Sequence, residues 1–260
     1  MWDALARNSR GWNENIALAI GKVTGTAVGG TINAPIACFV GVVPVSSTCQ
    51  PTGTGSWAGQ RGQLAAGQGD QYSGELGFES ITTATVEFVF NVNMTWTPPG
   101  VAPASAPIGA TQNIRCDSKR TFFPTSGCVY VNFTANMFVV SKSDPKVTEA
   151  ARFMARAQKA IPTHPGVFGV GSALTRTTDA TRIRRNRTVA CKNVHPGPGQ
   201  SCDEYPFAST NQGAALVPPG DFRAEAVNAK QNSQVGTNLS RFELFNRIAG
   251  RDSFYVKITS

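Results

Sequence analysis

Six cysteines fall into three local pairs, and this spacing constrains the possible fold more than any other feature of the chain. The partners lie 11, 12 and 11 residues apart: Cys38 and Cys49, Cys116 and Cys128, and Cys191 and Cys202. A disulfide that closes a loop of this size stabilises a protein by about 3 kcal/mol in chain-entropy estimates, less any strain. We therefore expect three short disulfide-closed loops and a destination in an oxidising compartment.

The same cysteines do not fit a zinc site. No pair has the tight Cys-x-x-Cys spacing, and the chain offers only His164 and His195 to complete such a site. Met1 to Gly21 includes Asp3, Glu14 and several other polar residues, so no secretory signal is visible there. Either the chain is a processed form, or it is delivered outside the producing cell by a route that reads no such signal. No segment has the roughly 20 continuous apolar residues of a membrane span.

The net charge of +8 is unevenly placed along the 260 residues. Residues 1–145 carry 8 basic and 8 acidic side chains, whereas residues 146–260 carry 16 and 8. A basic domain attracts polyanions at long range, which suits DNA or RNA and, less specifically, an anionic membrane surface. Hydrophobic residues make up 41% of the chain, which is enough to fill a core, so a disordered tail is excluded.

The amino-terminal half is rich in Gly, Thr, Val and Pro, and two of its segments alternate like half-buried strands. These segments are Thr83 to Trp96 and Cys128 to Val140. A Pro- and Ala-rich loop is expected between them, at 97–110. The pattern predicts an antiparallel β-rich accessory domain over residues 1–143.

The clearest helix signal covers residues 144–160, with Asp144 as its cap and Pro145 at its first position. We interpret 144–165 as a helix that links the two halves. From residue 166 onward the pattern predicts short strands and loops, then a helix at 236–248 and a final strand at 253–259. The expected fold class is α+β, with a small second domain at 166–260.

The most distinctive chemistry lies at the segment Cys202 to Ala208, which contains the adjacent carboxylates Asp203 and Glu204. An acidic pair can hold a hard divalent cation or take a proton. A dense basic run precedes it, consisting of Arg182, Arg184, Arg185, Arg187 and Lys192. Because such side chains hold phosphates, the local chemistry suggests a phosphodiesterase.

From about Arg185 to Phe254 the chain resembles the NucA/NucB deoxyribonuclease family. The signature of that family is an Asp-Glu-aromatic-Pro-Met/Phe-Ala segment followed by a stretch rich in Asn and Gly. Here those elements are residues 203–208, 231–236, 247–248 and 252–256. Agreement over several blocks is far more specific than a single motif. The resemblance implies a metal-dependent nuclease similar to the ββα-metal endonucleases, in which two strands and a helix hold one divalent ion.

The resemblance also implies roles for particular residues. Asp203 and Glu204 lie at the base region, Glu204 and Asn232 are the candidate metal ligands, and the ion is Mg²⁺ or Mn²⁺. Phosphate binding is assigned to Arg185, Arg187 and Lys192, with Arg187 also offsetting charge in the transition state. A carboxylate with a pKa of about 4 is a weak base. We therefore assign the base and metal roles to the coupled Asp203–Glu204 pair rather than to either residue.

Two residues keep alternative interpretations. His195 lies eight residues before Asp203 and is a possible base, although its Pro- and Gly-rich surroundings favour a flexible loop. Asn232 is equally compatible with a helix cap ahead of Ser233 to Leu239. The Cys191–Cys202 bridge would anchor the acidic pair in either case.

The leading hypothesis is a secreted or delivered endonuclease that cuts DNA with little sequence preference, since no base-reading module is evident. A nuclease domain behind a non-catalytic domain also resembles the layout of antibacterial toxins, which would imply an immunity or inhibitor protein as a partner. One alternative is a non-enzymatic, disulfide-stapled protein that binds polyanions such as nucleic acid. The other is a ribonuclease of the same metal class.

Overall fold

The computed structural model describes residues 9–25, 28–40, 43–44, 49–55, 63–80, 86–109, 113–117, 125–131 and 136–260. The described residues up to Val131 form one compact unit, and those from 136 to Ser260 form a second. The boundary expected between residues 143 and 144 therefore lies inside the second unit. None of the described helices is long and apolar enough to cross a membrane.

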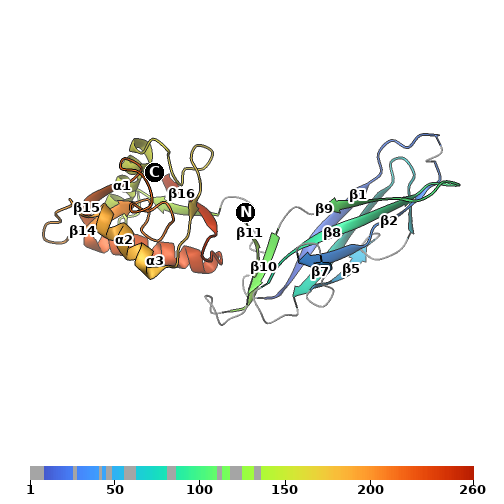
Figure 1. Ribbon diagram of the computed structural model, residues 1–260, viewed down its shortest axis with the longest axis horizontal. Helices are drawn as coiled ribbons and strands as arrows, with labels where there is room; N and C mark the ends of the chain where they lie inside the picture. The colour runs from blue at the N-terminus through green and yellow to red at the C-terminus, as the bar shows by residue number, and fades with distance from the viewer. Residues whose placement is uncertain are drawn as a thin grey trace. The chain divides into compact units, whose positions relative to one another are not determined.

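The first unit consists of antiparallel strands (Figure 1, blue to green). One sheet has the order β1 (Gly11–Ala19), β7 (Gln71–Ser80) and β5 (Cys49–Gly55). The path of the other sheet is β11 (Gly127–Val131), β10 (Asn113–Asp117), β8 (Val86–Thr97), β2 (Thr31–Asn33) and β6 (Gln63–Ala65). Off this path, β8 also pairs with β3 (Ile36–Val40) and β9 (Ala104–Gly109), and β3 pairs with β4 (Val43–Pro44). The antiparallel character expected for this half is confirmed.

Cys116 and Cys128 face each other across the β10–β11 pair and form a disulfide with an S–S distance of 1.97 Å. This pairing confirms one of the three expected loops. The side chains of Cys38 and Cys49 lie outside the described residues, so their pairing stays a prediction. The loop expected at 97–110 is wrong in part, because β9 forms there and pairs with β8. Pro107 is compatible with that strand, since β9 pairs with β8 alone among the described strands.

The single strand expected at 128–140 is also wrong, because the segment contributes two strands to two different units. β11 ends at Val131, and β12 (Met137–Ser141) runs parallel to β16 (Ser253–Thr259) in the second unit. The alternation continues into β12 because Phe138 and Val140 are buried on one of its faces. A period of two residues indicates a half-buried strand but does not specify its partner.

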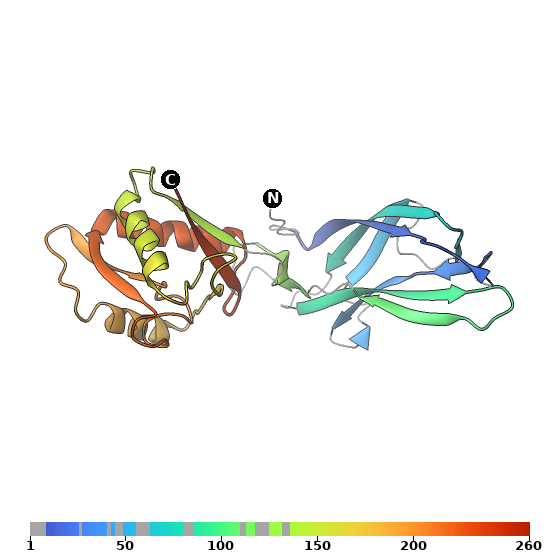
Figure 2. The ribbon, with the colours of Figure 1, turned by 90° about the horizontal axis from the view of Figure 1, so that it is seen from above.

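In the second unit β16 lies between β12 and β13 (Leu174–Thr175), and the expected final strand at 253–259 is confirmed. A separate antiparallel pair consists of β14 (Gln200–Tyr205) and β15 (Arg223–Asn228). The described part of this unit also contains α1 (Thr148–Ala160), α2 (Ala180–Ala190) and α3 (Ala229–Phe245). Helix α1 packs against β14, β15 and α3 (Figure 2, yellow-green against orange). The second unit therefore combines helices and strands around one core.

Helix α1 belongs to that core and does not serve as a link. Its side chain Phe153 is fully buried in the cluster that also contains residues of β12, β14 and β16. The helix begins at Thr148 rather than at Pro145. The carboxylate of Asp144 accepts a hydrogen bond from the backbone N–H of Lys146 in the turn that precedes the helix. Asp144 therefore does not cap α1 as expected, because the hydrogen bond that its side chain accepts lies in the turn before the helix.

Strands β14 and β15 and helix α3 follow one another along the chain as a strand–strand–helix unit (Figure 1). The side chain of Asn228 accepts hydrogen bonds from the N–H groups of Lys230 and Gln231 and caps the helix. Helix α3 therefore begins seven residues before the expected start at Gly236. Asn232 lies in the first turn, and the capping role considered for it belongs to Asn228.

The sequence pattern did not predict α2, where short strands and loops were expected. Asp179 caps this helix by accepting hydrogen bonds from the N–H groups of Thr181 and Arg182. The buried residues of α2 are Asn186 and Ala190. Because neither is a large apolar side chain, the helix has no hydrophobic periodicity to reveal it. The arginine run is thus carried by a helix that packs through small and polar residues.

Candidate active site

The adjacent carboxylates Asp203 and Glu204 lie on opposite faces of β14, because successive side chains of a strand point to opposite sides. Tyr205 shares the face of Asp203. Its hydroxyl accepts a hydrogen bond from Nε2 of Gln158 on α1 at 2.9 Å and donates one to the carbonyl of Pro165 at 2.7 Å. Asp203 is 4% exposed and Tyr205 0%, so this face is packed against α1. Glu204 points the other way, toward α2.

Glu204 and Arg187 form the charged pair of the site. Oε1 of Glu204 lies 3.7 Å from Nε of Arg187 on α2, and the two side chains are 15% and 68% exposed. Burial raises the pKa of Glu204, while the Arg187 guanidinium and the backbone N–H of Ala208 act in the opposite direction. The pair thus joins a largely buried anion to a cation that still reaches solvent.

The disulfide between Cys191 and Cys202 ties the end of α2 to β14, with an S–S distance of 2.06 Å and a Cα–Cα distance of 6.0 Å. Cys191 is the C-cap of α2 and follows Arg187 by four residues. Cys202 precedes Glu204 by two residues on β14. The bridge and the charged pair therefore join the same two elements, and a second expected disulfide is confirmed.

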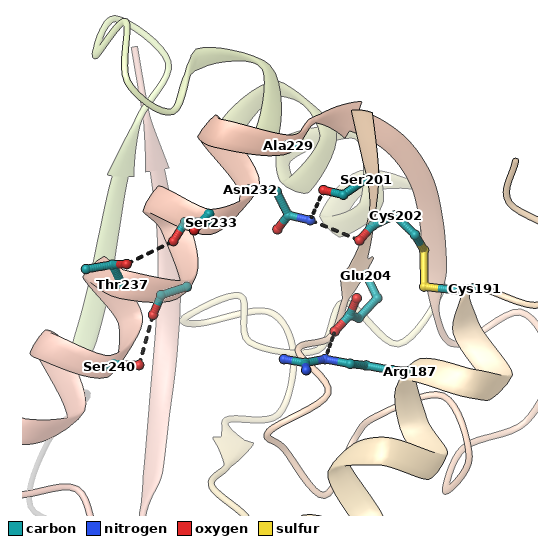
Figure 3. Close-up of a pocket in the computed structure, with 11 residues that line it drawn as sticks. Arg187, Cys191, Ser201, Cys202, Glu204, Ala229, Asn232, Ser233, Thr237 and Ser240 are labelled. Atoms are coloured by element: carbon teal, nitrogen blue, oxygen red, sulfur yellow. Dashed lines mark hydrogen bonds and ion pairs between the residues drawn. A yellow bond between two sulfur atoms is a disulfide. The ribbon is translucent and has the colours of Figure 1, made fainter. Parts of the chain in front are cut away.

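Asn232 connects the first turn of α3 to β14. Its Nδ2 donates to the hydroxyl of Ser201 at 3.1 Å and to the carbonyl of Cys202 at 2.9 Å. Both amide protons are used in this way, which leaves the amide oxygen as an acceptor. Figure 3 shows this oxygen facing the pocket between α3 and β14.

These side chains line one pocket of about 810 Å³ between β14, α2 and α3 (Figure 3). Its lining consists of Arg187 and Cys191 from α2, Ser201, Cys202 and Glu204 from β14, and Ala229, Asn232, Ser233, Gly236, Thr237 and Ser240 from α3. The volume is in the range of ordinary ligand sites. The lining residues from α3 are mostly small or carry hydroxyl groups. The charged side chains, Arg187 and Glu204, come from α2 and β14. A pocket of this kind has room for a phosphate group beside a cation.

The donor atoms of the pocket fit a hard divalent cation. Cys191, Cys202 and Glu204 each place a potential ligand atom within 4.8 Å of the others. The two sulfur atoms are bonded to each other, so neither is a thiolate and only Glu204 of this trio is available to a metal. The amide oxygen of Asn232 and the hydroxyl of Ser201 line the same pocket. Oxygen donors of this type suit Mg²⁺ or Mn²⁺ rather than zinc.

Asp203 does not line the pocket, although the sequence places it beside Glu204. Burial, and next the charge of Glu204, raise the pKa of Asp203 from its usual 3.8 to about 8. The coupling expected between adjacent carboxylates is present, but it is the smaller of these two causes. One oxygen of Asp203, Oδ2, is buried and has no hydrogen-bond partner among the residues that the structure describes. Asp203 is therefore held in the interior, where its neutral form is favoured.

The structure does not bring the other candidate residues into the pocket. Arg185 lies on α2 two residues before Arg187, which places it on nearly the opposite face of the helix. Lys192 and His195 are exposed in the segment that follows α2. None of these three side chains lines the pocket. These three residues are close to Arg187 in the sequence, but their side chains do not share the pocket with it.

Several lining residues were missed by the sequence analysis. Ser233, Thr237 and Ser240 lie on one face of α3 at spacings of four and three residues. This pattern can be recognised only once the helix is known to begin at Ala229.

Arg184 precedes Arg187 by three residues and shares its side of α2. The helical spacing of the arginines would have selected Arg184 in place of Arg185.

Residues 170–257 match the family model of deoxyribonuclease NucA/NucB. The match takes in α2, β14, β15, α3 and every residue that lines the pocket. The resemblance seen from Arg185 to Phe254 is therefore confirmed, and this carboxyl-terminal region is similar to a family of nucleases. A comparison with curated proteins finds no match for the chain.

Proposed function

We propose that the second unit is a divalent-metal-dependent deoxyribonuclease of the ββα-metal type, which hydrolyses DNA phosphodiester bonds with little sequence preference. One observation carries this proposal: Glu204, Asn232 and Arg187 come from a strand, a helix and a second helix and line the same pocket. That pocket lies within the region that matches the nuclease family.

Each of the three residues has a distinct role. Glu204 and the amide oxygen of Asn232 hold the cation, and the bonds from Asn232 to Ser201 and Cys202 keep that oxygen in place. A bound Mg²⁺ or Mn²⁺ supplies Lewis-acid polarisation of the scissile phosphate and stabilises the leaving oxygen. Arg187 binds a phosphate oxygen and offsets the charge that grows in the transition state.

The roles first given to the Asp203–Glu204 pair are assigned to Glu204. It is the carboxylate among the lining residues, so it is placed to accept the proton of the attacking water as well as to bind the cation. Asp203 supports the strand from the opposite face. Phosphate binding is assigned to Arg187 and to Arg184 beside it, because Arg185 lies on the far side of α2.

We also propose that the protein acts outside the cell that makes it. The support is the pair of disulfides, which persist in oxidising surroundings. A β-rich unit is followed by a region that matches the nuclease family, and this order resembles the layout of delivered antibacterial toxins. On that layout we propose a toxin with an immunity protein as its partner.

The test is cleavage of supercoiled plasmid by oxidised protein with Mg²⁺, with Mn²⁺ and with chelator. Nicking is expected with a metal and is expected to disappear in chelator and in Glu204→Gln. Glu225→Gln is the matched control, because Glu225 lies in the same hairpin, pairs with Arg156 and does not line the pocket. Salt-sensitive DNA binding without cleavage under any metal would instead identify a polyanion-binding protein. Cleavage of RNA but not DNA in a substrate panel would identify a ribonuclease.

A further inference from the structure

Asn186 is a buried side chain on α2, next to Arg187 in sequence, and all of its polar atoms are used. It is 0% exposed. Its Nδ2 donates to the carbonyls of Ala208 at 2.9 Å and Thr210 at 3.2 Å, and its Oδ1 accepts from the N–H of Ala215 at 3.1 Å. Three hydrogen bonds from one side chain thus fix α2 to the segment 208–215, here called the anchoring loop. A fully satisfied buried amide of this kind specifies one arrangement of the elements that it joins.

Gly213 closes the anchoring loop onto Asn186. A Cβ atom at position 213 would lie 2.1 Å from Nδ2 of Asn186 and 2.4 Å from its Cγ. No side chain larger than hydrogen fits between them, because real Cβ atoms do not approach so closely. The loop backbone therefore confines the amide from one side while its carbonyls hold it from another.

The anchoring loop that Asn186 holds also acts on Glu204. The backbone N–H of Ala208, the first residue of this loop, lowers the pKa of the Glu204 carboxylate. The carbonyl of the same residue, Ala208, accepts from Asn186. Asn186 is thus connected to both members of the charged pair: to Arg187 through the backbone of α2, and to Glu204 through Ala208. It does not line the pocket itself.

We propose that Asn186 is a positioning residue, which sets the separation between Arg187 and Glu204 for phosphodiester cleavage; this role rests on the proposed nuclease function. Arg187 is mostly exposed and reaches Glu204 at 3.7 Å, so its placement depends on the helix that carries it. A displacement of about 1 Å at a reacting centre can reduce a rate by about 100-fold. The Asn186 amide prevents such a displacement of α2.

The first test is Asn186→Asp, which keeps the size of the side chain and an oxygen that accepts from Ala215. The second carboxylate oxygen faces the carbonyls of Ala208 and Thr210, so the two donated bonds are lost. We expect kcat for plasmid cleavage to fall by about 100-fold. DNA affinity measured in chelator should change much less than kcat, because the other basic side chains that attract the DNA backbone remain in place. A fall in DNA affinity with unchanged kcat would overturn the proposal.

A double-mutant cycle with Arg187→Ala separates positioning from general damage to the fold. If Asn186 acts through the charged pair, the double variant loses much less than the product of the two single losses. Losses that multiply would overturn the proposal. Asn211→Ala is the matched control, since Asn211 also ties the anchoring loop to α2, through Arg182 on the exposed side. Its kcat should match the wild type, and a loss equal to that of Asn186→Asp would count against a specific role for Asn186.

Gly213→Ala tests the same contact from the loop side if Asn186→Asp does not fold. The added methyl displaces the amide while all hydrogen-bonding groups remain, so kcat should fall by a larger factor than DNA affinity. In Asn186→Ala/Gly213→Ala the methyl enters vacated space, so Tm should rise above that of Gly213→Ala. Its kcat should stay low, because the carbonyl of Ala208 has lost its hydrogen-bond donor. Full recovery of kcat would overturn the proposal.

Failure of the nuclease function itself would look different. Wild-type protein that cuts nothing with any metal would overturn that function, whereas losses that multiply in an active enzyme would overturn only the role of Asn186.

Discussion

The two faces of β14 carry neighbouring carboxylates into opposite surroundings. On one face Asp203 is 4% exposed, lies opposite Glu225 in the hairpin and shares its side with Tyr205, which is bonded to α1. On the other face Glu204 meets Arg187 of α2 at the edge of a polar pocket. The sequence motif gives no reason to assign different roles to Asp203 and Glu204, but the structure gives them different neighbours.

The difference shows that the helices, rather than the acidic motif, decide which of the two carboxylates lines the pocket. Helix α1 shields Asp203 from solvent, and the resulting burial is the main reason that the pKa of Asp203 rises to about 8. Helices α2 and α3 leave space beside Glu204 and supply a guanidinium and an amide. A carboxylate binds a cation and substrate only where the fold leaves room for them.

The largest expected effect comes from exchanging each carboxylate for its amide. Glu204→Gln should reduce plasmid cleavage by at least about 100-fold, because it removes the proposed metal ligand and proton acceptor. Asp203→Asn should retain most of the wild-type rate. Steady-state cleavage by the two variants, at equal folded concentration, checks the comparison. A greater loss in Asp203→Asn than in Glu204→Gln would reverse the assignment of the two faces.

The next effect concerns the bridge on the pocket face. Replacing Cys191 and Cys202 by Ser should destabilise the second unit by about 3 kcal/mol, as estimated for closure of a short loop. Cleavage should fall as well, because the bridge joins the two elements that carry Arg187 and Glu204. Thermal unfolding and plasmid nicking are the measurements. Replacing Cys116 and Cys128 is the control, and it should leave the cleavage rate of folded protein unchanged.

The buried face should be visible in the pH dependence of stability. The pKa of Asp203 is about 8 in the folded protein and near 3.8 when unfolded, so folding takes up a proton between these values. The stabilisation is fully present below about pH 4 and is lost as the pH rises through about 8. Asp203→Asn should therefore show a shallower decline of the free energy of unfolding over that window. Urea titrations in chelator measure this, and an unchanged slope would argue that Asp203 is not the protonated group.

The smallest expected effect compares two arginines on the two sides of α2. Arg184→Ala should weaken DNA binding and reduce the slope of log K against log salt by about 1, as expected for one lost phosphate contact. Arg185→Ala changes the net charge equally but removes a side chain on the far side from the pocket. Its salt slope should change less. Binding titrations over a range of salt concentrations test this, and equal slopes in both variants would remove the distinction between the two sides.

The sequence was a good guide where local signals decided the structure. The final strand 253–259, the β-rich character of the first unit and the pairings Cys116–Cys128 and Cys191–Cys202 are as expected. It was a poor guide where a helix packs through small or polar side chains. Helix α2 is buried through Asn186 and Ala190, so no apolar stripe marks it. Without that helix, Arg185 and Arg187 could not be told apart.

The sequence alone determined which residue types make up the candidate site: two adjacent carboxylates, a basic run, an asparagine some 30 residues later and a local disulfide. These features could be recognised because each depends on residues that are close together in the chain. Only the tertiary structure decided which members meet. The alternation of β14 separates Asp203 from Glu204, and the rotation of α2, held by Asn186, turns Arg187 rather than Arg185 toward the pocket. The physical reason is that side-chain direction depends on which face of each element is buried, and burial is set by partners distant in sequence.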